Sequence, residues 1–380
     1  MRSRSWWLRA AAPAAIVGAT IAAVNIGLPA SAAPSLPTKS PQQLLAMIAQ
    51  AKVPGVSGTV VEKASLGLPA LPTGVGGQAT SGLMGLLSGT HSLRVWVGKP
   101  GELRLQVLGT LDETEVVSNG TDLWTYVYST NQASHATIPA HTKTAAEPLG
   151  TAPTSPIQLA NQVIAAIGPT TAVTVSGTAT VAHHSVYTLQ IRPRTSDSTV
   201  GLVSVDVDAA TGVPLRVQLF ASGATSAAFS IGFSQVTFHA ISASQFTFKP
   251  PAGARVSALG GGASMAGKSS ATPSNPPESP TAPATPSSDG SSVVGTGWAS
   301  VLVFAHNPLN NIASSPGGEG GRNSVDIAGL LAKAGTRVNG GTLYHTTLVN
   351  MLATDDGRLL VGAVPPAVLQ KALTAPAPAA

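Results

Sequence analysis

Residues 262–269 read GASMAGKS and match the phosphate-loop pattern GxxxxGK[ST] at every fixed position. A working phosphate loop needs a strand before it and a helix after it, because the first turn of that helix presents backbone N–H groups to the phosphate. Pro273, Pro276 and Pro277 follow closely and are incompatible with such a helix. We therefore predict that this chain binds no nucleotide.

Pairs of histidines and aspartates offer a second kind of chemistry. His183 and His184 are adjacent, and successive side chains of a strand point to opposite faces, so these two cannot readily share one metal ion. Asp206 and Asp208 share one face of a predicted strand, where two carboxylates can do acid–base chemistry. Because Thr211-Gly212 predicts a turn just after them, we favour a solvated strand edge for the aspartates. For the histidines we favour a turn or surface position.

No other motif predicts catalysis. The chain has no HExxH metal motif, no GxSxG nucleophile elbow and no cysteine, which also excludes disulfides and thiolate ligands. Asn119-Gly120-Thr121 fits a glycosylation acceptor, but we favour a hairpin turn there, as we do for Asp355-Asp356-Gly357. We expect no catalytic residue, no metal site and no cofactor, and hence a protein that is not an enzyme.

The first residues are typical of a signal peptide for export. Arg2, Arg4 and Arg9 precede a mostly apolar stretch, and Ala30-Ser31-Ala32 fits the small-x-small cleavage pattern. We expect residues 1–32 to be removed and the protein to be extracytoplasmic, either secreted or in the cell envelope; an uncleaved membrane anchor is the alternative. Removal of residues 1–32 lowers the formal net charge from +5 to +2. Because no basic cluster remains, we predict no nucleic-acid partner.

The elements that remain are mostly strands. Ser40-Pro41 and Thr154-Ser155-Pro156 each predict the start of a helix, because serine and threonine cap helices and proline suits the first helical turn. Alternating apolar residues predict strands elsewhere, and the clearest series runs from Val173 to Phe238. We expect a mainly β (α+β) fold with about eleven strands and two helices over residues 40–250.

Composition divides the chain into parts. Residues 36–256 form the predicted main domain, and within it the apolar patch at residues 79–87 lies in a long loop of the kind that serves as a lid. Residues 257–292 are rich in Pro, Ser and Gly and predict a linker. Residues 293–376 recover the alternation of strands and predict a small α+β domain.

Period-two alternation implies that one face of the main sheet is buried or faces a ligand. We assign apolar and aromatic residues from both strand series to that face: Val95, Val97, Leu105, Val107, Trp124, Tyr126, Leu215, Val217, Phe229, Ile231 and Phe233. They are either ordinary core or the lining of a cavity for an apolar ligand, and the alternation is compatible with both.

Four segments resemble a known family when they are taken in order. The segments 42–45 (QQLL), 56–62 (VSGTVVE), 205–216 (VDVDAATGVPLR) and 246–251 (FTFKPP) are similar to the LolA-like lipoprotein-carrier superfamily, over roughly residues 36–256. The resemblance implies an unclosed antiparallel β-barrel around plugging helices, with an apolar cavity for acyl chains. The arrangement with a smaller second domain resembles RseB/MucB.

Two functions follow from these observations. The first is an exported, non-enzymatic carrier or binding protein for the acyl chains of lipids or lipoproteins. Each buried CH₂ contributes about 0.8 kcal/mol, so a long chain can bind without polar recognition. The second, which the resemblance to RseB/MucB implies, is an envelope regulatory protein that binds an anti-sigma factor or another membrane protein.

Overall fold

The computed structural model describes residues 35–67, 88–108, 113–138, 155–165, 167–258, 291–307 and 335–374. Several predicted features lie outside these residues: the signal peptide, the phosphate-loop match, the apolar loop patch at 79–87 and most of the linker. All of the described residues belong to one compact unit.

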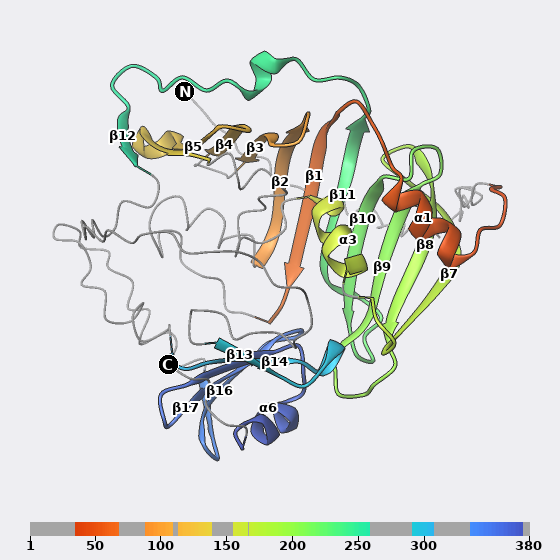
Figure 1. The fold of residues 1–380 in the computed structure, drawn as a ribbon, viewed down its shortest axis with the longest axis vertical. Helices are drawn as coiled ribbons and strands as arrows, with labels where there is room; N and C mark the ends of the chain where they lie inside the picture. Colours follow the sequence, from red (N-terminus) through yellow and green to blue (C-terminus); the bar gives the residue numbers. More distant parts are fainter. Residues whose placement is uncertain are drawn as a thin grey trace, which may run out of the picture. The chain divides into compact units, whose positions relative to one another are not determined.

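The main feature is a sheet of twelve strands in the described part of the chain, in the order β12-β6-β5-β4-β3-β2-β1-β11-β10-β9-β8-β7 (Figure 1). The first six strands are β1 (Val56–Ser65), β2 (Ser88–Val97), β3 (Glu102–Leu108), β4 (Glu113–Asn119), β5 (Asp122–Val127) and β6 (Gln132–Thr137). The others are β7 (Thr171–Val181), β8 (His184–Pro193), β9 (Val200–Asp208), β10 (Pro214–Ala221), β11 (Ala227–Thr237) and β12 (Arg255–Ala258).

This sheet is open. Strands β7 and β12 are its two edges, and every neighbouring pair is antiparallel except β12 with β6, which is parallel. Strand β1 joins the two predicted strand series because it pairs with β2 on one side and with β11 on the other. Eleven of these strands lie between residues 40 and 250, so the mainly β, unclosed architecture predicted from the sequence is confirmed for the described residues.

Two helices cover part of one face of the sheet. Helix α1 (Pro41–Ala49) begins with a capping box, in which Ser40 Oγ accepts from Gln43 N–H and Gln43 Oε1 accepts from Ser40 N–H. Helix α3 (Pro156–Ala165) begins after Ser155, whose Oγ accepts from Gln158 N–H. Helix α1 contacts β7 and β8, and α3 contacts β10 and β11 (Figure 1). Their apolar side chains pack against the sheet there and form one hydrophobic core with it.

A second antiparallel sheet of six described strands has the order β13-β14-β18-β17-β16-β15. Its strands are β13 (Ser291–Val294), β14 (Val301–Phe304), β15 (Gly335–Val338), β16 (Gly341–His345), β17 (Asn350–Thr354) and β18 (Leu359–Gly362). Helix α6 (Pro366–Ala372) packs on β17 and β18 and closes a separate small core. Strand β12 extends into the segment 257–292 from one end, and β13 extends into it from the other.

Candidate ligand-binding face

Strand register places nine of the eleven predicted face residues on one face of the twelve-stranded sheet, which we call the inner face. Directly opposed residues on neighbouring strands share a face, and Val60 of β1 lies opposite both Leu93 of β2 and Phe233 of β11. The nine residues are Val95 and Val97 of β2, Leu105 and Val107 of β3, Leu215 and Val217 of β10, and Phe229, Ile231 and Phe233 of β11. Helices α1 and α3 pack on this same face.

Most of the inner-face residues are buried, but two of them are reachable. Val97 and Phe229 keep intermediate exposure, whereas Leu215, Val217 and Ile231 are fully buried. The three buried residues belong to β10 and β11, the strands that α3 covers. The nine residues therefore form a largely apolar surface, and few of their side chains are accessible.

Trp124 and Tyr126 do not share the inner face, so this part of the prediction is wrong. Their partners on β4 are Val117 and Glu115, whereas the inner-face residue Leu105 lies opposite Val116, which pairs with Thr125. The alternation within β5 does not reveal which of its two faces points inward, because Thr125 is polar and its neighbours are aromatic. Only the pairing of β5 with β4 shows on which face Trp124 and Tyr126 lie.

The two aromatic residues instead form a cluster on the outer face. The ring centroids of Trp124 and Tyr126 lie 5.5 Å and 5.6 Å from that of Phe248, and Trp124 stacks on His135 at 4.2 Å. The segment FTFKPP therefore folds back over β5, beyond the short 3-10 helix η4 (Ala243–Phe246).

A buried acid, Glu62, interrupts the apolar inner face. Its side chain is 1% exposed, and neither carboxyl oxygen has a hydrogen-bond partner. Burial raises the pKa of Glu62 from 4.5 to about 8, because the charged form is poorly solvated there. The sequence analysis did not single out Glu62, although the spacing Val60, Glu62, Ala64 places it on the face that is otherwise apolar.

Other buried acids of the sheet have partners. Arg216 Nε donates to Asp206 Oδ2 at 2.6 Å, and Thr188 Oγ1 donates to Asp206 Oδ1 at 2.6 Å. Asp208 accepts from Thr211 N–H at 2.9 Å, where it closes the turn between β9 and β10. Both aspartates are buried, so the predicted solvated edge is wrong. Neighbouring strands supply the partners that make their burial possible.

Of the adjacent histidines, His183 lies in a turn and His184 is the first residue of β8. Ala182 and His183 have φ of +50° and +67° and connect β7 to β8, while His184 Nδ1 lies 3.2 Å from Asp208 Oδ1. The predicted turn is confirmed for His183, and His184 is a partly exposed residue at the start of β8. No group of three or more His, Cys, Asp or Glu side chains in the described ranges is arranged to hold a metal ion.

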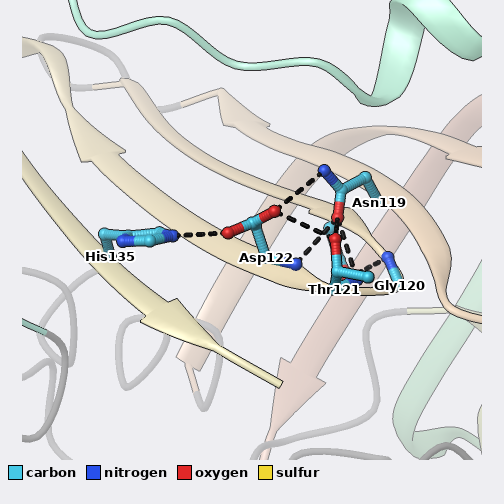
Figure 2. A network of polar contacts seen from close by, with 6 residues as sticks. Asn119, Gly120, Thr121, Asp122 and His135 are labelled. Carbon is cyan, nitrogen blue, oxygen red and sulfur yellow. Dashed lines mark hydrogen bonds and ion pairs between the residues drawn. The ribbon is translucent and has the colours of Figure 1, made fainter. Parts of the chain in front are cut away.

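An acid–histidine pair lies on β5 and β6 next to a tight turn (Figure 2). His135 Nε2 lies 2.8 Å from Asp122 Oδ1, and this contact is the main reason that the pKa of Asp122 is lowered. Asn119 Oδ1 accepts from the backbone N–H groups of Thr121 and Asp122 at 2.9 Å and 2.7 Å. The network closes the β4–β5 hairpin, as the Asn-Gly motif predicts.

A shallow depression of about 450 Å³ lies on the outer face rather than beneath the sheet. It is lined by Ser57, Gly58, Thr59, Arg94, Trp96, Gln235, Val236 and Thr237. Its lining mixes polar and apolar side chains and lies on the opposite face, so it is distinct from the apolar cavity that the resemblance implies. Among the described helices, none has the length and hydrophobicity needed to cross a bilayer.

An open, mostly antiparallel sheet with helices packed on one face agrees with the unclosed sheet and plugging helices that the sequence resemblance implies. The chain matches no protein-family model and no curated protein.

Similar solved structures include the MucA/MucB complex of Pseudomonas aeruginosa, with 16% identity, a TM-score of 0.39, and coverage of 87% of this chain and 96% of that chain. A LolA superfamily protein from Nitrosomonas europaea is 12% identical, with a TM-score of 0.23, and covers 56% of this chain and 99% of its own. An uncharacterized conserved protein from Thermus thermophilus is 11% identical, with a TM-score of 0.33 and coverage of 57% and 98%.

Proposed function

We propose that this chain is an exported, non-enzymatic protein that binds or carries the acyl chains of lipids or lipoproteins against the inner face of its twelve-stranded sheet. The single observation that carries the proposal is that this face extends across β3, β2, β1, β11 and β10 and is apolar apart from a few positions such as Glu62 and His91. Helix α3 covers the part of this face that β10 and β11 form. Packing of an acyl chain on the accessible part contributes about 25 cal/mol of binding free energy for each Å² of apolar surface removed from water.

Uptake of a fluorescent long-chain fatty acid by the purified chain tests this proposal. Phe229→Asn removes a reachable apolar side chain from the inner face, and we expect it to weaken uptake about tenfold. Ser230→Asn is the matched control, because Ser230 is the next residue of β11 and points to the outer face. Equal uptake by both variants and the wild type, or no uptake by any of them, contradicts the proposal.

A regulatory role, with a membrane protein of the envelope as partner, is the second candidate. The second sheet supports it, because β13–β18 and α6 have a core of their own and Val293 is 64% exposed on the edge strand β13. A photo-crosslinking amino acid at position 293 should then capture one membrane protein in native envelopes. The same label at Tyr128, which is exposed in the connection between β5 and β6, should not. Capture of the same proteins from both positions, or from neither, counts against this role.

A further inference from the structure

Glu62 occupies a central place on the inner face. It lies opposite Ile231 of β11 and His91 of β2, and Val60 and Ala64 are its neighbours on the same face of β1. Phe229 and Phe233 flank Ile231 on the same face of β11. Apart from His91, the neighbours of this carboxyl group on the sheet are the apolar side chains that are proposed to contact an acyl chain.

This carboxyl group is anomalous among the buried acids of the sheet. Asp206, Asp208 and Glu115 all have hydrogen-bond partners, whereas both oxygens of Glu62 have none. Buried polar groups in folded proteins are nearly always hydrogen-bonded, because an unsatisfied group loses its hydration without compensation. A bound ligand would supply the hydrogen-bond partner that the fold does not provide for Glu62.

We propose that Glu62 is the polar contact for a neutral hydroxyl or amide group carried by the apolar ligand. This inference rests on the proposed function and specifies the ligand as an amphiphile with an uncharged headgroup. A protonated carboxyl group donates one hydrogen bond and accepts others, so it can satisfy a hydroxyl or an amide in both directions.

The surroundings favour a neutral partner over a cationic one. Because burial raises the pKa of Glu62 to about 8, the carboxyl group is mostly protonated at neutral pH. Binding of an ammonium headgroup would require the ammonium and the Glu62 carboxylate to lose their hydration together. The attraction between these two charges offsets that cost only when their geometry is very good. On the neighbouring described strands, His91 is the titratable side chain that shares this face, and helix α3 consists of uncharged residues.

Two probes that differ only at the headgroup test the inference. Radiolabelled oleyl alcohol and oleyl methyl ether are delivered to the chain from phosphatidylcholine vesicles, and the bound amounts are compared. We expect the wild type to bind the alcohol about tenfold more tightly, because the ether cannot donate a hydrogen bond to Glu62. Glu62→Leu should bind both probes equally, and Glu62→Gln should keep part of the preference. Glu113→Leu is the control, because it removes a carboxyl group from the outer face of the same sheet.

The outcomes separate the two proposals. Binding of both probes with no preference, or a preference that persists in Glu62→Leu, overturns the role of Glu62 and leaves the acyl-chain proposal standing. Binding of neither probe overturns both. If Glu62→Leu does not fold, infrared difference spectra of the wild type decide the question. The carbonyl band of the protonated carboxyl, assigned by its loss in Glu62→Gln, should shift with the alcohol and not with the ether; no shift with the alcohol refutes the inference.

Discussion

Replacing Glu62 by glutamine should abolish a large pH dependence of stability. In the folded chain the pKa of Glu62 is raised from 4.5 to about 8, whereas in the unfolded chain the carboxyl is solvated and keeps its ordinary value. The folded state therefore holds a proton on Glu62 over a pH range in which the unfolded state has lost it.

The sign and the size follow from proton linkage. Below pH 4.5 the group is protonated in both states and has no pH-dependent effect. Between pH 4.5 and about 8 the folded state binds more protons, so the free energy of unfolding falls as the pH rises. Each pKa unit corresponds to about 1.4 kcal/mol, which gives a loss of about 5 kcal/mol across this window. Above pH 8 the contribution no longer changes.

Urea unfolding followed by the fluorescence of Trp96 and Trp124 at pH 5, 6, 7 and 8 measures this effect. Wild type and Glu62→Gln should have similar stability at pH 5, and the variant should be more stable by about 4 to 5 kcal/mol at pH 8. Glu113→Gln controls for the loss of an acid elsewhere in the sheet. If wild type and Glu62→Gln lose stability in parallel as the pH rises, the carboxyl is not isolated in the way that the structure shows.

Two further predictions concern the rest of the sheet. Arg216→Met leaves the carboxylate of Asp206 buried with Thr188 as its remaining partner. We expect the free energy of unfolding, measured in urea, to fall by about 2 kcal/mol. Adding Asp206→Asn in a double variant should restore part of this loss. Gly58→Ala brings a Cβ into the carbonyl oxygen of Gln235 and should destabilise the chain by about 2 kcal/mol or more. Gly168→Ala meets open space and should change the melting temperature little, so equal effects of the two glycine substitutions contradict this reasoning.

Local signals predicted the local structure well. Ser40, Pro41 and Gln43 contain the whole capping box of α1 within four residues, and Asn119-Gly120 specifies the β4–β5 turn. The alternation of apolar residues was sufficient to place the strands of the second series, because period-two patterns depend on neighbouring residues alone.

Features that depend on pairing between distant strands were not predictable in the same way. The side on which Trp124 and Tyr126 lie is decided by the register of β5 against β4, and the burial of Asp206 depends on Arg216 from the next strand. The isolation of Glu62 is likewise set by what β2 and β11 present beside it. A single sequence contains these residues but not the register that brings them together.

The position of β1 between β2 and β11 has a consequence for how the chain acquires its structure during synthesis. Residues such as Val60 and Phe233 meet across the sheet although most of the large domain separates them along the polypeptide. Because synthesis proceeds from the N-terminus, one side of β1 stays without its partner until β11 has emerged, and such long-range closure is slow. An unpaired strand edge can also join a neighbouring chain. Newly synthesised molecules should therefore be most vulnerable to aggregation just before residue 237 emerges, and a holding chaperone would act best within that interval.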